Sequence, residues 1–166
     1  MGIVVRELLK TDWIAVSNIY AEGIATGIAT FETEVPEWEL WNEKYIEHIR
    51  IVTELNNEVV GFTVLSQVSI RKVYKGVAEV SVYVSTNHRG HKIGETLLKQ
   101  LIMESENYGF WTLQANIFSE NKASINLHKK CGFRMVGIRE KIGMLHGKWH
   151  DNHLLERRSK LITNIK

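Results

Sequence analysis

The sequence predicts an α+β fold in which helices cover both faces of a mixed β-sheet. Strand-like and helix-like segments alternate along the middle of the chain, and hairpin signals flank that series. The 166 residues are enough for one hydrophobic core of ordinary size. We therefore expect a single domain spanning residues 1–166.

The N-terminal part of the chain predicts a strand and two helices. Residues 3–6 are β-rich, a helix opens at Asp12, and residues 23–36 form a loop rich in Gly, Thr and Ala. A second helix is expected over residues 37–48, with Pro36 at its start. The expected buried faces are Ile14, Ala15, Ile19 and Tyr20 on the first helix, and Trp38, Trp41, Tyr45 and Ile49 on the second.

The central part predicts a hairpin followed by a strand, a helix and a further strand. Asn56 and Asn57 separate two β-rich runs, and asparagine tolerates the positive φ of tight turns. The next run alternates Val, Ser and Tyr around one acidic residue, and an apolar stripe at helical spacing follows it. The expected bounds are strands over residues 51–55, 59–65 and 77–84, a helix over residues 90–107 and a strand over residues 113–118.

The C-terminal part predicts a short helix and a last hairpin. Asn121 is placed to cap the helix, which ends at Cys131-Gly132. Residues 133–145 and 148–155 then form two strands joined at His146-Gly147.

Composition excludes several classes of protein. The chain is 44% hydrophobic and 24% charged, unlike disordered or collagen-like chains. The longest apolar run, residues 59–65, is far shorter than the roughly 20 residues that cross a bilayer. The single cysteine cannot form an intramolecular disulfide, and no His, Cys, Asp or Glu cluster has metal-ligand spacing. We expect a cytoplasmic protein with no membrane segment and no metal.

Charge is unevenly distributed although the net charge is only +2. Residues 1–60 carry 11 Asp and Glu against 4 Lys and Arg, whereas residues 128–166 carry 3 against 10. A basic C-terminal part could bind nucleic acid, surround a phosphate-bearing cofactor, or be no more than a solvated face. No aromatic residues are interleaved along a basic stripe, which disfavours nucleic acid.

The most informative segment is residues 82–95, where a strand leads through a basic, glycine-containing turn into a helix. That order directs free backbone N–H groups and the positive helix end at one point, where a pyrophosphate can bind. The segment lacks the three spaced glycines of a dinucleotide fingerprint and the Gly-Lys-Ser/Thr of a triphosphate loop. It therefore indicates a different diphosphate, unless it is an ordinary helix start.

Several blocks carry a resemblance to a known family. Residues 89–94 resemble the Gln/Arg-x-x-Gly-x-Gly/Ala signature of the acetyl-CoA-dependent N-acetyltransferase (GNAT) superfamily, with Lys92 where the family usually has its middle glycine. Residues 121–133 resemble that family's later Asn-x-x-Ser/Ala to Gly-Phe block. Ile19-Tyr20, residues 29–34 and residues 146–151 (His-Gly-Lys-Trp-His-Asp) look like the branch containing phosphinothricin and methionine sulfoximine acetyltransferases.

The resemblance implies a single-domain GNAT-like fold and an enzyme that transfers acetyl from acetyl-CoA to the amino group of a small amino acid or analogue. The acceptor would be of the phosphinothricin or methionine sulfoximine type. No metal is implied, and a homodimer is expected because it is common among such relatives. Acetyl-CoA is expected at Val82, Tyr83, Val84, Arg89, Gly90, His91, Lys92, Ile93, Gly94, Glu95 and Asn121.

Two residues are candidates for proton transfer. Glu79 lies mid-strand, where a carboxylate is unusual unless it is solvated or functional. The resemblance implies a base that deprotonates the acceptor ammonium, directly or through water, and a strand-edge glutamate facing solvent is the alternative. His128 stands where the resemblance implies a proton donor to the departing thiolate, and a capping or core histidine is the alternative.

The acceptor site is expected beside Glu79. The resemblance implies that the polar connection over residues 66–76 borders this site, where an arginine could bind the carboxylate of an amino acid. It also implies an apolar wall from the loop after the first helix. A plain surface or core role is the alternative for both features. The residues expected around the acceptor are Phe31, Arg71, Lys72, Glu79, Val80 and Ser81.

Other functions stay open from the residues alone. A GNAT-like enzyme could act on a protein N-terminus or lysine, which requires an open acceptor groove. A non-catalytic acyl-CoA sensor or nucleic-acid-binding module could use the basic C-terminal part, although Glu79 and His128 disfavour the sensor. Cys131 has no assignable catalytic partner, so covalent catalysis is disfavoured and we expect this thiol to be buried.

Overall fold

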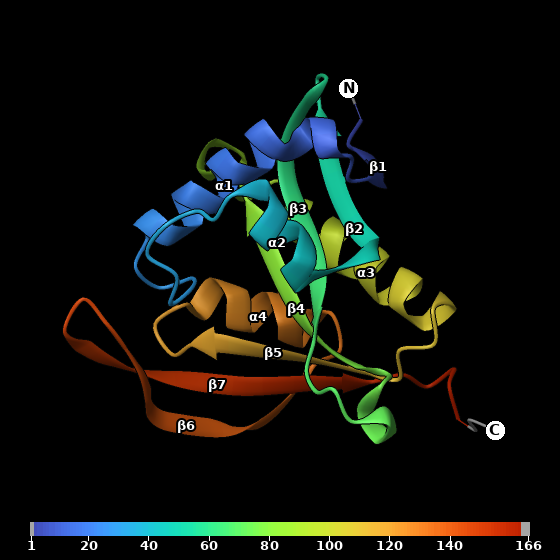
Figure 1. Cartoon of the computed structure of the whole chain (residues 1–166), viewed down its shortest axis with the longest axis vertical. Helices are drawn as coiled ribbons and strands as arrows, with labels where there is room; N and C mark the ends of the chain where they lie inside the picture. Colours follow the sequence, from blue (N-terminus) through green and yellow to red (C-terminus); the bar gives the residue numbers. More distant parts are fainter. Residues whose placement is uncertain (1, 164–166) are drawn as a thin grey trace.

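The computed structural model describes residues 2–163. Their strands form one mixed seven-stranded sheet in the order β1-β2-β3-β4-β5-β7-β6 (Figure 1). Neighbouring strands are antiparallel except β4 and β5, which are parallel. The strands are β1 (Val4–Glu7), β2 (Tyr45–Leu55), β3 (Glu58–Gln67), β4 (Val77–Val84), β5 (Thr112–Phe118), β6 (Arg134–Leu145) and β7 (Lys148–Arg158). The α-helices are α1 (Trp13–Ala25), α2 (Trp38–Lys44), α3 (Ile93–Asn107) and α4 (Lys122–Lys130).

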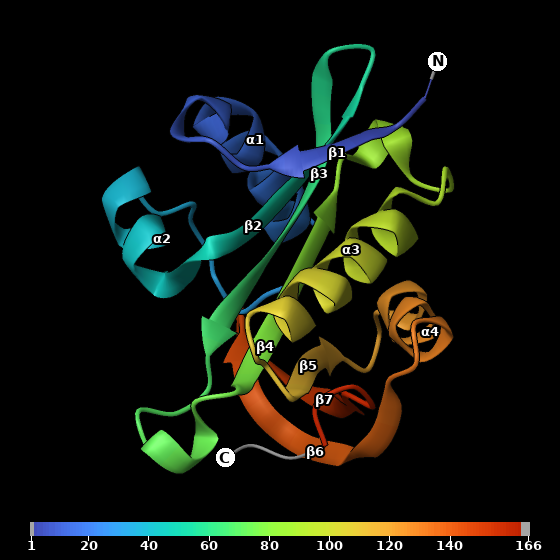
Figure 2. The same ribbon diagram turned by 90° about the vertical axis from the view of Figure 1, so that its right-hand side faces the viewer.

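Helices cover both faces of the sheet, as the sequence predicts. Figure 2 shows α1 and α2 on one side and α3 and α4 on the other. Each side has its own apolar cluster. Val16 of α1 and Trp41 of α2 pack with Phe62 on the first side, and Leu97 of α3 packs with Leu113 of β5 on the second. The α+β expectation is confirmed.

Turn and cap residues behave as their local chemistry predicts. Asn56 and Asn57 have positive φ in the turn between β2 and β3, and His146-Gly147 do so between β6 and β7. The Asn121 side chain caps α4 by accepting a hydrogen bond from the backbone N–H of Ser124 at 3.2 Å. Both predicted hairpins and the predicted cap are therefore confirmed.

The second predicted helix is wrong in its last turn. Helix α2 ends at Lys44, and Tyr45 already begins β2, where it pairs with Ser66 of β3. The Arg50 guanidinium donates hydrogen bonds to the Tyr45 carbonyl oxygen and to the Asn42 side-chain oxygen, both at 2.5 Å, which holds this change of direction. The apolar spacing is real, because Tyr45 is buried, but sheet pairing overrides the helical period.

Two other expectations need correction at helix starts. Ile14 is 77% exposed, and the buried face of α1 uses Val16 beside Ile19 and Tyr20, because the helix turns Ile14 away from the sheet. Helix α3 begins at Ile93 rather than at residue 90, because residues 90–92 form the preceding turn.

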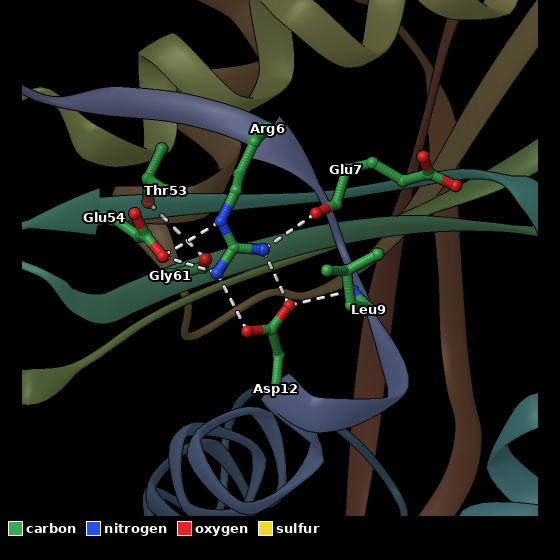
Figure 3. Close-up of polar contacts among 7 residues, drawn as sticks. All are labelled: Arg6, Glu7, Leu9, Asp12, Thr53, Glu54 and Gly61. Atoms are coloured by element: carbon green, nitrogen blue, oxygen red, sulfur yellow. Dashed lines mark hydrogen bonds and ion pairs between the residues drawn. The ribbon is translucent and has the colours of Figure 1, made fainter.

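One arginine adds side-chain contacts to the backbone pairing of β1 with β2 (Figure 3). The Arg6 guanidinium donates to both carboxylate oxygens of Asp12, at 2.7 and 2.8 Å, and its Nε donates to Glu54 of β2 at 2.9 Å. The Asp12 carboxylate also accepts from the Leu9 N–H at 2.8 Å. These hydrogen bonds, led by those from Arg6, lower the pKa of Asp12. These contacts join β1, the turn before α1 and β2.

The parallel pair β4–β5 opens into a split. The two strands pair at Val77 with Thr112, Ala78 with Leu113 and Glu79 with Gln114, and the pairing ends there. Figure 1 shows them diverging beyond this point, with β4 running upward and β5 leftward. Residues 80–84 pair with β3 on one side and face the split on the other. The split therefore exposes backbone groups of β4 in the middle of the sheet.

Candidate active site

One cavity, of about 510 Å³, lies between the end of β4, the start of α3 and helix α4. The left-handed turn before α3 forms part of its wall. Among the residues predicted to bind a cofactor, His91 does not line this cavity, and its ring nitrogen Nδ1 lies 3.1 Å from the Arg89 carbonyl oxygen. The predicted residues that do line it are Val82, Tyr83, Val84, Arg89, Gly90, Lys92, Ile93, Gly94, Glu95 and Asn121.

The turn into α3 has features that favour the binding of an anion. Lys92 adopts a left-handed conformation, with φ 62° and ψ 9°, directly before the first helical residue. The first backbone N–H groups of a helix have no partner within it, and here they begin at a wall of the cavity. Lys92 thus takes the conformation that glycine adopts most easily, while adding a positive charge.

Lys130 is a cation of this cavity that sequence reasoning missed. Its Nζ lies 2.5 Å from Oε2 of Glu95, and Nζ of Lys99 lies 2.7 Å from Oε1 of the same carboxylate. Hydrogen bonds from Lys130 and then Lys99 lower the pKa of Glu95 to about 2. Two lysines therefore offset the negative charge of the one carboxylate at the helix start. The basic C-terminal part of the sequence was the available signal.

A second cavity, of about 250 Å³, lies in the split itself. It receives residues from the loop after α1, from β4 and β5, and from α4 and β7. Ala29, Val82, Tyr83, Asn121 and Ser124 line both cavities, so the two spaces adjoin. A long ligand in the first cavity can therefore meet a small one in the second.

Glu79 lines the second cavity and is held on one oxygen. Its Oε2 accepts hydrogen bonds from Gln114 Nε2 at 3.0 Å and from Asn116 Nδ2 at 2.7 Å. Within residues 2–163 no such partner is found for Oε1. The carboxylate is thus oriented while one oxygen stays available. Sequence reasoning missed Gln114 and Asn116, although their alternation on a strand with apolar neighbours was a usable signal.

His128 lines the same cavity from α4 and is only 3% exposed. Its Nδ1 lies 2.8 Å from the backbone carbonyl oxygen of Ser124, which can only accept, so Nδ1 carries the proton. Nε2 is then an acceptor, and it has no hydrogen-bond partner in the described part of the chain. Burial lowers the pKa of His128. The imidazole is therefore neutral near pH 7 and can donate from Nε2 only after that nitrogen gains a proton.

Only some of the other residues predicted to surround the acceptor line this cavity. Phe31, Val80 and Ser81 line the cavity with Glu79. Arg71 and Lys72 do not line it, because the connection that carries them forms a short 3₁₀ turn outside the sheet. The Arg71 guanidinium instead lies over the Tyr74 ring, 5.4 Å from its centroid. The structure therefore does not bring the expected carboxylate-binding residues to Glu79.

Lys44 is a lysine of the second cavity that sequence reasoning missed. Among the described residues it is the one Lys or Arg that lines this cavity. Its Nζ lies 3.3 Å from the Glu32 carboxylate, and both side chains are about half exposed. Such an exposed pair is weak, so the ammonium group can change partners. No sequence signal marked Lys44, because it ends a helix that was predicted to continue.

The single cysteine of the sequence contributes to neither cavity. Cys131 is buried, as predicted, and burial raises the pKa of its thiol. It lies outside the lining of both cavities. Within residues 2–163 no cluster of three or more His, Cys, Asp or Glu could hold a metal ion. In the same range no helix is both long and apolar enough to span a bilayer.

The arrangement of strand, turn and helix around the split belongs to a part of the chain that matches a known protein family. The model of the acetyltransferase (GNAT) family matches residues 9–133, which include β4, α3 and α4. The chain belongs to the GNAT family. The predicted family and the predicted fold are thus confirmed, and acetyl transfer is the chemistry of its relatives.

Similar GNAT proteins include enzymes named for small amino-acid-like acceptors. A phosphinothricin N-acetyltransferase of Alcaligenes faecalis is 31% identical over 92% of this chain and 81% of its own length. An L-methionine sulfoximine/L-methionine sulfone acetyltransferase of Salmonella typhimurium is 29% identical over 86% of both. A phosphinothricin acetyltransferase of Sinorhizobium meliloti, solved in complex with acetyl-CoA, superposes with a TM-score of 0.86 at 29% identity, covering 95% and 89% of the two chains.

Proposed function

We propose that this chain is an amino-acid N-acetyltransferase that uses acetyl-CoA. Its acceptor is a small amino acid or analogue of the phosphinothricin or methionine sulfoximine type. One observation carries the proposal: a carboxylate held by two amides lies in a small cavity that adjoins a larger one at the end of β4. Residues 1–166 would act as one catalytic domain, in the cytoplasm and as a homodimer.

The larger cavity is the proposed site of acetyl-CoA. The unpaired side of residues 80–84 offers backbone N–H and C=O groups to the amides of the pantetheine arm, in the manner of an added strand. The start of α3 offers backbone N–H groups to the pyrophosphate, and Arg89, Lys92 and Lys130 add positive charge. The arm then leads from the large cavity toward the small one, where the thioester would meet the acceptor.

Proton transfer is assigned to Glu79 and His128. Glu79 removes a proton from the acceptor ammonium, directly or through water, so that a neutral amine attacks the thioester carbonyl. As the new N–C bond forms and the C–S bond of the thioester breaks, the amine nitrogen releases a second proton, which we assign to Nε2 of His128. The same proton then passes to the departing thiolate. This order agrees with a histidine that is neutral before the reaction.

Lys44 supplies the charge that a zwitterionic acceptor needs. With Glu79 taking the ammonium group, a cation elsewhere in the cavity can take the carboxylate, and Lys44 lines that cavity. Arg71 and Lys72 stay candidates only for an acceptor that reaches beyond the cavity lining.

A turnover assay tests the function. Acetyl-CoA consumption would be measured with free amino acids, methionine sulfoximine, methionine sulfone and phosphinothricin, beside a panel of peptides with free N-termini or lysines. Preference for free amino acids or their analogues supports the proposal. Faster turnover of peptides would replace it with a protein acetyltransferase, and acetyl-CoA binding without turnover of any acceptor would indicate a sensor.

A further inference from the structure

The strand β6 carries a glycine that the proposed reaction does not use, and it lies under the apolar wall of the acceptor cavity. We propose that Gly143 sets how large an acceptor the cavity admits, because its missing side chain leaves room for the ring of Phe31. The inference rests on the proposed function, since it concerns the selectivity of the same site.

The contact between Gly143 and Phe31 is close. A Cβ added at Gly143 would lie 2.5 Å from Phe31 Cζ, 2.7 Å from Cε1 and 3.0 Å from Cε2. Real side chains do not approach so closely, so the edge of the ring occupies the space that any other residue would fill. Phe31 lines the acceptor cavity and Gly143 does not. The ring therefore separates the glycine from the cavity.

Neighbouring aromatic rings restrict the movement of the Phe31 ring. Its centroid lies 4.4 Å from that of Phe118 and 6.2 Å from that of His150. The His150 ring packs 4.8 Å from Phe118, is 5% exposed, and has Nδ1 3.0 Å from the Glu120 carboxylate. A methyl group on Gly143 would thus push a ring whose remaining neighbours are packed, and the open direction is the cavity.

A bulge in β6 of the C-terminal hairpin determines the position of Gly143. The register of β6 on β7 shifts between Arg139 and Gly143, and Lys141 within the shift has φ 45°. The Asp151 carboxylate accepts a 2.7 Å hydrogen bond from the Lys141 N–H, which stabilises this bulge. Beyond it, Gly143 pairs with His150. Asp151 and His150 of the His-Gly-Lys-Trp-His-Asp motif therefore both help to position Phe31.

The test uses Gly143→Ala with Gly137→Ala as its matched control. Gly137 lies on the same strand, and among the described residues nothing lies within 4 Å of a Cβ added there. The kcat/KM values would be measured over a series of L-amino acids of increasing side-chain length that the wild type acetylates. Gly143→Ala should lower kcat/KM for the longest acceptors by about tenfold and for the shortest by less than about twofold. Gly137→Ala should leave the series unchanged.

A double variant identifies the route of the effect. In Phe31→Ala the cavity is enlarged, and adding Gly143→Ala to this background should cost nothing, because the ring that it displaces is gone. An unchanged acceptor series in Gly143→Ala would overturn the inference. So would a loss that persists in the Phe31→Ala background, because Gly143 would then act through strand geometry.

A readout without substrate separates this inference from the proposed function. Aromatic ¹H–¹³C NMR should show the Phe31 resonances shifted in Gly143→Ala and unshifted in Gly137→Ala, with or without an active acceptor. If the wild type acetylates no amino acid, the proposed function fails and the selectivity inference fails with it, whatever the NMR result. If the wild type is active and Phe31 does not move, only the selectivity inference fails.

Discussion

Asn116 on β5 donates a 2.7 Å hydrogen bond from Nδ2 to Oε2 of Glu79 on β4. The backbone pairing of the two strands ends at Glu79 and Gln114, two residues before Asn116. The side-chain bond therefore continues across the sheet where the backbone ladder stops. It orients the carboxylate toward the split, and the proposed chemistry depends on that orientation.

Glu79→Gln should lower kcat/KM by roughly 10² or more while leaving acetyl-CoA affinity nearly unchanged. Glutamine keeps an oxygen that can accept from Gln114 and Asn116, so the geometry is retained while the base is lost. Steady-state kinetics beside isothermal titration with acetyl-CoA would measure both effects. Turnover like that of the wild type would remove Glu79 from the mechanism and leave the fold untouched.

Asn116→Ala should lower kcat/KM by about tenfold, because it removes the shorter of the two hydrogen bonds to the carboxylate and leaves only that from Gln114. Gln114→Ala should cost less, since its bond to the same oxygen is longer at 3.0 Å. In the Glu79→Gln background, Asn116→Ala should add little to the loss. Equal effects of Asn116→Ala with and without Glu79 would show that the asparagine acts independently.

His128 should make the protein sensitive to mild acid. Its pKa is lowered in the folded state, so the unfolded chain binds the proton more readily. Its contribution to stability is therefore present above the unfolded pKa of about 6.5 and is lost as the pH falls below that value. Urea denaturation would be measured at about pH 7.5 and about pH 5, on either side of the unfolded pKa of about 6.5. The unfolding free energy should fall less between these two pH values in His128→Phe than in the wild type.

The same His128→Phe variant should reduce kcat by a smaller factor than Glu79→Gln, because a CoA thiolate is a tolerable leaving group near neutral pH. Both variants would be assayed with one acceptor at saturating acetyl-CoA. A larger loss in His128→Phe would reverse the assigned order of importance.

Gly94→Val should raise the KM for acetyl-CoA by about tenfold or more, equivalent to about 1.4 kcal/mol. Gly94 lines the cofactor cavity at the second position of α3, where a branched side chain would obstruct the approach to the backbone. Its Cβ would also lie 3.1 Å from Cδ2 of Leu127. The melting temperature should therefore be recorded as a control. Unchanged cofactor affinity in a folded variant would contradict the pyrophosphate assignment.

Lys44→Gln should raise the KM for an amino-acid acceptor several-fold (about 1 kcal/mol) without changing acetyl-CoA affinity. The corresponding decarboxylated amine should show no such change, because it has no carboxylate to lose. Arg71→Ala is the informative comparison, since its guanidinium lies over Tyr74 outside the cavity. If Arg71→Ala weakens amino-acid binding and Lys44→Gln does not, the carboxylate is bound by the connection before β4.

The sequence by itself determined the features that depend on neighbours along the chain. The Asn56-Asn57 turn, the His146-Gly147 turn and the Asn121 cap follow from side chains and backbone preferences within a few residues. The strand over residues 77–84 agrees with β4 at both ends. The resemblance carried by residues 89–94 likewise located the turn into α3, because that turn is one continuous segment.

Only the tertiary structure decided the features that join distant segments. Helix α2 ends at Lys44 because the next residue pairs with β3, and that pairing places Lys44 at the acceptor cavity. Asn116 contacts Glu79, 37 residues away in sequence, because β4 and β5 lie side by side. Gly143 contacts Phe31 because the last hairpin packs against the loop after α1. Period and propensity describe a residue's local surroundings, whereas these contacts depend on how strands separated in sequence are packed together.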